Sequence, residues 1–179
     1  MVQTQAVDLK ELVLSNGTFG PAEIETIRGA IAREHSQFAT LRDLVGELEA
    51  QEGPSPASSV RLGVGLYLLG RFRRAAEVLA SADGGAVAHF YLARCLFNAE
   101  QYDEAIEAYR KAKKAGYDGG LCDIGVAEAM RYQGKAAEGL AVLDQLFGPI
   151  EQTSEYLYQR GATVAAIGGN PSEVVALYE

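Results

Sequence analysis

The chain has 179 residues, of which 48% are hydrophobic and 22% charged, a composition that excludes wholesale disorder and allows a sizeable core. Its 16 basic and 24 acidic side chains give a formal net charge of -8, which would repel a polyphosphate backbone. We therefore expect no nucleic-acid partner.

The two cysteines, Cys95 and Cys122, lie among apolar or small residues and not in a Cys-rich framework, which indicates buried thiols in a reducing compartment. No stretch reaches the roughly eighteen apolar residues that cross a bilayer. The first residues are polar and lack a basic segment followed by an apolar one. These features predict a cytoplasmic protein without a membrane span.

The first element expected is a short helix around Leu9 to Leu14, which could cap one end of a helical stack. Residues 21–51 allow two interpretations. Apolar residues at heptad spacing, broken at Glu34, suggest one long coiled-coil helix. Alternatively, a turn near Ser36 makes the segment a degenerate repeat, with Gly29 at a close helix contact and Phe38 on the second helix. We favour the hairpin, because "HSQ" is a poor helix interior.

An internal repeat follows the connection "GPSPASS" at residues 53–59. Residues 60–82, "VRLGVGLYLLGRFRRAAEVLASA", align with residues 90–112, "FYLARCLFNAEQYDEAIEAYRKA", so that apolar and small residues superpose. Two further copies follow at offsets of thirty-four residues, around Val126 and Val164. The matched positions are Leu62 with Leu92, Leu66 with Leu96, Phe72 with Tyr102, Ala75 with Ala105, and Leu79 with Tyr109.

The motifs "LGVGL", "LARCL" and "AIEAY" resemble the tetratricopeptide repeat, over residues 56 to 179. The resemblance implies an all-α, right-handed α-solenoid of helix-turn-helix repeats. We divide the chain into amino-terminal helices at 1–55 and repeats at 56–85, 86–119, 120–153 and 154–179, the last one truncated. The helix that opens at Pro171 stops at Glu179, which suggests that a longer parent chain was cut there.

Small residues recur where the two helices of a repeat would approach closely, because larger side chains there would overpack the contact. They are Gly63, Ala93, Ala127 and Gly161 on the first helices, and Ala75, Ala105 and Gly139 on the second helices. Gly70, Gly134 and Gly168 share the slot of the short turn, where a positive φ is often needed. Glu100 occupies that slot in the second repeat and departs from the rule.

Motifs for catalysis or cofactor binding are not found. Gly63-x-Gly65 lies within a predicted helix and follows no strand, which argues against a phosphate loop. His35 and His89 stand at no recognised metal-ligand spacing from each other or from the cysteines. We therefore expect a protein that is not an enzyme and has neither a cofactor nor a metal.

The first helices of tetratricopeptide repeats line a concave groove, and the resemblance places several aromatic and arginine residues there. Such residues are typical of binding hot spots. Alternatively, neighbouring helices cover some of them, and Arg94 pairs with Glu128. The predicted groove residues are Val64, Tyr67, Phe90, Arg94, Phe97, Asn98, Arg131, Tyr132 and Tyr158.

These residues predict a non-catalytic protein-interaction scaffold that binds a peptide or helix of a partner in the groove. The clamp of Lys, Asn and Arg by which some family members hold acidic peptides of chaperones is not reproduced, since Val60 and Val64 stand at the first slots. The alternative is a self-association module that drives assembly of a homo-oligomer.

Overall fold

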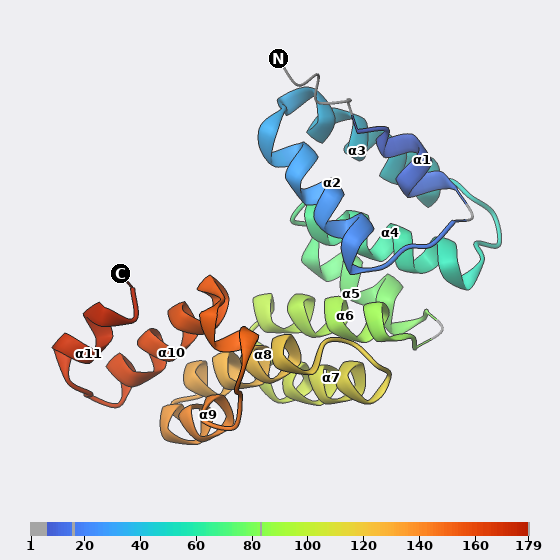
Figure 1. The fold of residues 1–179 in the computed structure, drawn as a ribbon. Helices are drawn as coiled ribbons and strands as arrows, with labels where there is room; N and C mark the ends of the chain where they lie inside the picture. Colours follow the sequence, from blue (N-terminus) through green and yellow to red (C-terminus); the bar gives the residue numbers. More distant parts are fainter. Residues whose placement is uncertain (1–6, 16, 83, 179) are drawn as a thin grey trace, which may run out of the picture. The chain divides into compact units, whose positions relative to one another are not determined.

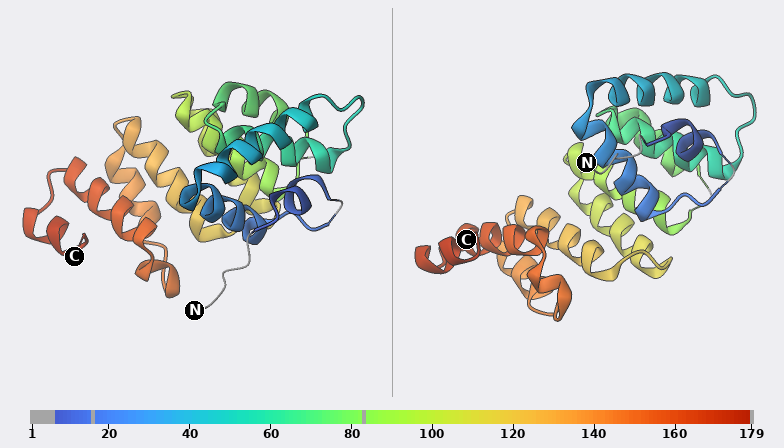
Figure 2. Two further views of the ribbon diagram at one scale, coloured as in Figure 1. Left: turned by 90° about the horizontal axis from the view of Figure 1, so that it is seen from above. Right: turned by 45° about the horizontal axis from the view of Figure 1, so that its top comes forward.

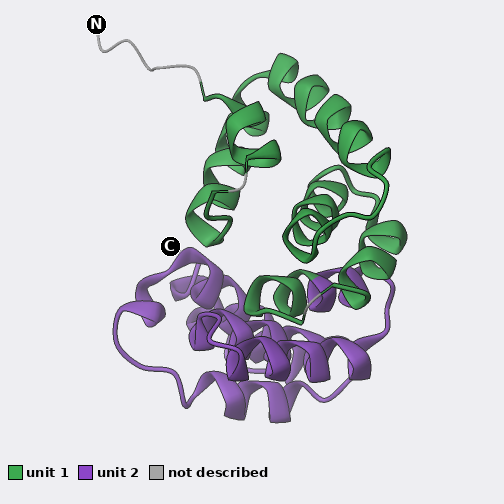
Figure 3. Ribbon diagram, turned by 90° about the vertical axis from the view of Figure 1, so that its right-hand side faces the viewer, with its two compact units in different colours: residues 1–91 green, residues 92–179 purple. Residues whose placement is uncertain are grey.

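The computed structural model of the protein describes residues 7–15, 17–82 and 84–178. In these ranges the backbone forms eleven α-helices and one 3-10 turn, with no β-strand (Figure 1). The predicted all-α class is confirmed. The chain divides into two compact units, residues 1–91 and 92–179, and the boundary falls inside helix α6 (Ala86–Asn98) (Figure 3).

Unit 1 is built from α1 (Leu9–Leu14), α2 (Pro21–Arg33), α3 (His35–Glu49), α4 (Pro56–Leu68), α5 (Phe72–Ala80) and the start of α6. Local sequence sets the helix starts. The Ser55 hydroxyl accepts a hydrogen bond from the Ser58 amide at 3.1 Å, and Pro56 then takes the first helical position. Helix α3 packs against α1, α2 and α4, which buries Leu9, Ile24, Leu41 and Val45.

Residues 21–51 form two helices and not one long helix, because the backbone is extended at Glu34 (φ -135°, ψ 121°). The break therefore lies two residues before Ser36, where we expected the turn. Phe38 lies on the second helix of this hairpin, as expected, and is 38% exposed. The close helix contact expected at Gly29 is wrong, because a Cβ there would meet only the side chain of Arg33 from its own helix.

Unit 2 continues from α6 with α7 (Tyr102–Lys114), α8 (Gly119–Tyr132), α9 (Ala136–Leu143), a 3-10 turn (Pro149–Gln152), α10 (Ser154–Ala166) and α11 (Pro171–Ala176). Helix α8 packs between α7 and α9, and α10 packs against α8, α9 and α11 (Figure 2). The core of this unit includes Ile124, Ala127, Leu143 and Tyr156. The predicted repeat limits stay a prediction.

The small residues lie where helices approach closely, as predicted. A Cβ on Gly63 would stand 2.4 Å from Leu79 Cγ on α5, and a Cβ on Gly139 would stand 2.8 Å from the carbonyl oxygen of Ala127 on α8. Ala75 and Ala105 are fully buried. These positions accept no larger side chain unless a helix or a neighbouring side chain moves, which explains why the pattern recurs.

The turns within the four helix pairs α4/α5, α6/α7, α8/α9 and α10/α11 have the same geometry. Gly70, Gly134 and Gly168 have φ values of 75°, 78° and 73°, as predicted for the shared slot. Glu100 adopts φ 61°. Among the residues that the structure describes, it is the only one other than glycine with a positive φ. Each turn has the paired hydrogen bonds of the Schellman motif; in the second, the amides of Glu100 and Gln101 donate to the carbonyls of Phe97 and Leu96, both at 3.0 Å.

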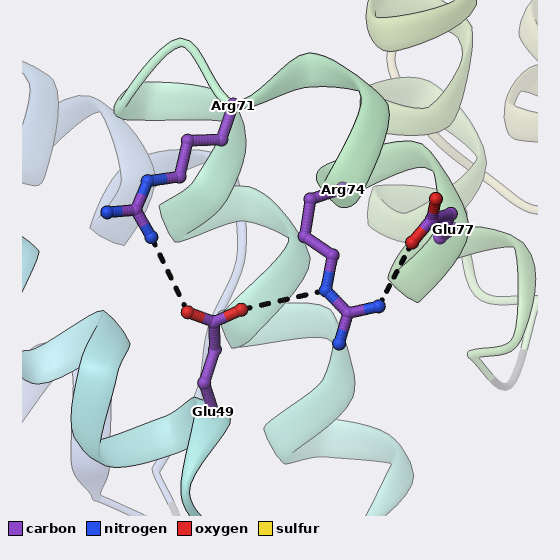
Figure 4. A network of polar contacts seen from close by, with 4 residues as sticks. All are labelled: Glu49, Arg71, Arg74 and Glu77. Atoms are coloured by element: carbon purple, nitrogen blue, oxygen red, sulfur yellow. Dashed lines mark hydrogen bonds and ion pairs between the residues drawn. The ribbon is translucent and has the colours of Figure 1, made fainter.

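A charged cluster joins the carboxyl end of α3 to the α4/α5 turn (Figure 4). The Glu49 carboxylate lies 3.4 Å from Arg71 and 3.6 Å from Arg74, and Arg74 also pairs with Glu77 at 3.0 Å. The hydrogen bond to Glu77 is the main cause that raises the pKa of Arg74. These side chains are largely exposed, so the cluster holds the surface of unit 1 together only weakly.

Candidate protein-binding surface

A row of polar side chains crosses three helices of unit 2. Arg94 on α6 lies 3.8 Å from the Glu128 carboxylate on α8. Gln159 on α10 donates from Nε2 to Glu128 at 2.8 Å, and its Oε1 accepts from Arg131 Nη2 at 3.0 Å. We call Arg94, Glu128, Arg131 and Gln159 the polar row. Because Gln159 is only 2% exposed and uses both ends of its amide, the row fixes the direction of Arg131.

Next to the polar row lies an aromatic cluster, which we define as Phe97, Tyr102 and Tyr132. The Tyr132 ring is 5.1 Å from Phe97 in an edge arrangement and 5.9 Å from Tyr102 in a stacked one, and Phe97 is 5.6 Å from Tyr102. The Arg131 guanidinium lies 4.7 Å over Tyr132. Desolvation, assisted by the Glu100 charge, raises the pKa of Tyr102, so its hydroxyl stays neutral.

Tyr132 is held on several sides and still presents a large apolar face, since it is 55% exposed. Tyr158 on α10 is 56% exposed and contacts Tyr178 at 6.0 Å. Unit 2 therefore carries aromatic rings that are fixed in position but accessible. This combination of rigidity and exposure is what a protein-binding hot spot requires.

The predicted groove residues do not all reach the surface. Val64 is 0% exposed and belongs to the core of unit 1, so its expected groove contact is wrong. The reason is that α4 is covered on more than one side, because five other residues near Val64 in this helix are also buried. Tyr67 and Phe90, also in unit 1, are half-buried and pack against Tyr91 at 5.1 and 5.5 Å.

In unit 2 the structure brings together most of the remaining predicted residues. Arg94 and Arg131 join the polar row, and Phe97 and Tyr132 join the aromatic cluster. The alternative that Arg94 pairs with Glu128 is confirmed. Asn98 is exposed, and its amide donates to the Arg94 carbonyl at 2.8 Å near the end of α6.

Sequence reasoning missed Gln159 and the ring contacts of Tyr102. Gln159 directly follows Tyr158, the predicted groove residue on α10. A search of α10 for polar residues next to Tyr158 could have found it. Tyr102, which the repeat aligns with Phe72, begins α7 and reaches the rings of α6 and α8.

The described residues give no sign of a metal or membrane site. No group of three His, Cys, Asp or Glu side chains within them could hold a metal ion. No helix in the described ranges is both long and apolar enough to span a bilayer. Cys95 and Cys122 are free and buried, as predicted, and desolvation raises the pKa of each thiol to about 12.

Known proteins share this architecture. Residues 40–115 match the family of the anaphase-promoting complex, cyclosome, subunit 3. A putative kinesin light chain from Podosopora anserina with nearly identical TPR-like repeats aligns with 89% of the chain and 93% of its own, at 16% identity and a TM-score of 0.59. The chain has the fold of tetratricopeptide-repeat proteins.

Two further solved structures extend the comparison. The structure named MamA MSR-1 C2 covers 86% of this chain and 89% of its own, at 15% identity and a TM-score of 0.62. The APC/C hetero-tetramer Cut9-Hcn1 covers 94% of this chain at 13% identity and a TM-score of 0.69, and the match spans 34% of that longer chain. No curated protein matches the chain in sequence.

Proposed function

We propose that the chain is a non-catalytic scaffold that binds a peptide or helix of a protein partner, with the aromatic cluster of unit 2 as its main contact. The observation that carries the proposal is Tyr132, a ring held by Phe97, Tyr102 and Arg131 and yet 55% exposed. Support also comes from the similar structure of the Cut9-Hcn1 hetero-tetramer, which is a protein complex.

Binding would proceed by apolar burial onto a surface that is already ordered. Because Tyr132 is 55% exposed, covering its remaining surface contributes about 0.8 to 1.6 kcal/mol, roughly half of what full burial of a large apolar side chain gives. Because the polar row holds Arg131, and Arg131 in turn lies over Tyr132, little side-chain entropy remains to be lost on binding. Arg94, whose side chain is 33% exposed, would set the orientation of a polar group on the partner.

Replacing Phe97 and Tyr132 together by alanine tests the proposal. Peptides selected from a phage-displayed library on the wild-type chain should bind the double variant at least about tenfold more weakly, a loss of 1.4 kcal/mol or more. The matched control is Phe147→Ala, which removes a ring that is 85% exposed and lies outside the cluster. Far-UV circular dichroism checks that helicity is kept. Peptides that bind both variants as tightly as wild type would refute the proposal.

A second candidate function is self-association, which the carboxyl-terminal helices favour. Ile167, Val175 and Tyr178 are 45%, 53% and 50% exposed, and all belong to or flank α11. A second copy of the chain could cover these apolar side chains. Light scattering over a concentration series separates the two functions, because a constant monomer mass contradicts self-association and leaves peptide binding intact.

A further inference from the structure

Arg61 on α4 is a buried charged residue. Its side chain is 5% exposed; Nη2 donates to the Gly17 carbonyl, Nη1 donates to the Ala57 carbonyl at 3.4 Å, and the guanidinium lies 5.1 Å over the Phe19 ring. Nε is buried and has no hydrogen-bond partner. No carboxylate in the described ranges forms an ion pair with it.

A charge removed from water is costly unless an opposite charge or a full set of hydrogen bonds replaces the lost solvation. Two carbonyls and a ring supply only part of that replacement for Arg61. Burial accordingly lowers the pKa of the Arg61 guanidinium, although arginine remains charged at neutral pH. Among the residues that the structure describes, this buried cation of unit 1 thus has no ion-pair partner.

Arg61 lines a cavity of about 260 Å³ whose other walls are mainly apolar, with Phe19, Val60, Val87 and Ala88 among them. One wall is the first turn of α6, a helix of 13 residues. The first amides of a helix have no acceptor within it and carry partial positive charge, which favours an anion. Arg61 and the residues of this first turn therefore line the same small space.

We propose that this cavity binds a small aliphatic monocarboxylate. Its carboxylate pairs with Arg61 and the first turn of α6, and its alkyl end packs against Phe19 and Val60. The volume is below the range of about 300 to 1,000 Å³ that is typical for drug-sized ligands, which fits an acid of a few carbons. Arg61 supplies one positive charge to the cavity, and the net charge of -8 on the chain repels further negative charge on a ligand. A monoanion is therefore favoured over a polyanion.

Nuclear magnetic resonance titration of the whole chain with isobutyrate tests the proposal, and isobutyramide is the matched neutral control. We expect saturable amide shifts at Phe19, Arg61, Val87 and Ala88 with isobutyrate, and at least tenfold weaker binding of isobutyramide. Inorganic phosphate at equal ionic strength is a further arm. Equal responses to acid and amide, shifts that never saturate, or tighter binding of phosphate would overturn the proposal.

A variant separates the charge from the rest of the cavity. Arg61→Met should weaken isobutyrate binding at least tenfold, whereas Arg42→Met, which removes an exposed arginine paired with Asp43, should leave it unchanged. If Arg61→Met does not fold, the comparison of acid and amide on the wild-type chain still decides the matter. Unchanged binding in a folded Arg61→Met variant would refute the site.

N-acetylvaline distinguishes two sources of the same carboxylate. Tighter binding of N-acetylvaline than of isobutyrate indicates the end of a peptide chain, and the reverse indicates a free acid; both results support a carboxylate site. The inference goes beyond the proposed function. The cavity lies in unit 1 and the aromatic cluster in unit 2, so the Phe97→Ala and Tyr132→Ala double variant should bind isobutyrate as the wild type does.

Discussion

Substituting Gly139 by alanine measures how tightly α8 and α9 are packed. The new Cβ would stand 2.8 Å from the carbonyl oxygen of Ala127, closer than the roughly 3.3 Å at which carbon and carbonyl oxygen normally approach. That oxygen belongs to the backbone of α8, so no side-chain rotation relieves the overlap. Overpacking of this kind costs about 1 to 3 kcal/mol.

The same substitution also removes a glycine from a helix, which stabilises by about 0.8 to 1 kcal/mol. Gly46→Ala isolates that gain, because no atom lies within 4 Å of a Cβ on Gly46 in α3. We expect Gly46→Ala to raise the free energy of unfolding by about 1 kcal/mol. Gly139→Ala should leave it unchanged or lower it by up to about 2 kcal/mol, the difference between the overpacking cost and the helix gain.

Urea denaturation followed by far-UV circular dichroism gives both values on the whole chain. The informative quantity is the difference between the variants, expected at about 1 to 3 kcal/mol, since the gain in helix propensity cancels. If Gly139→Ala stabilises the protein as much as Gly46→Ala does, the close contact between α8 and α9 does not exist and the packing described for unit 2 is wrong.

Two further predictions concern the backbone and the thiols. Glu100→Gly should raise the free energy of unfolding by about 1 kcal/mol in the same urea assay, because a left-handed conformation costs other residues roughly 1 to 2 kcal/mol; a loss of stability would contradict the assigned φ. Burial raises the pKa of Cys95 and Cys122 from 9.0 to about 12, so the stability from keeping them neutral is complete below pH 9 and is lost as the pH rises toward 12. Native thiols should react with a disulfide reagent at neutral pH far more slowly than unfolded ones, and rapid modification of the native chain would contradict their burial.

Much of the fold follows from the spacing of small residues. Gly63 and Gly139 predict where two helices meet, because only glycine or alanine fits such a contact. The turn glycines at 70, 134 and 168 predict a positive φ that the structure contains. Glu100 shows why residue identity alone is insufficient: the hydrogen bonds of the turn impose the conformation even where the residue does not favour it.

The candidate site was predicted less completely, since exposure depends on contacts that no single repeat contains. Val64 occupies a position that the family alignment assigns to the groove, but packing within unit 1 buries it. Gln159 was missed because its role depends on Glu128 and Arg131, which lie on another helix. Arg61 gave a signal that went unused, a lone charge within the apolar run "VRLGVGLYLL".

The turn geometry shared by the four helix pairs affects how easily further helix pairs could be added to such a chain. Each reversal is made by main-chain hydrogen bonds and one left-handed residue, and side-chain identity matters little, as Glu100 demonstrates. A duplicated hairpin would therefore carry its own means of reversing direction and its own small-residue contact between its two helices. Lengthening by tandem gene duplication would then require few compensating changes elsewhere in the chain.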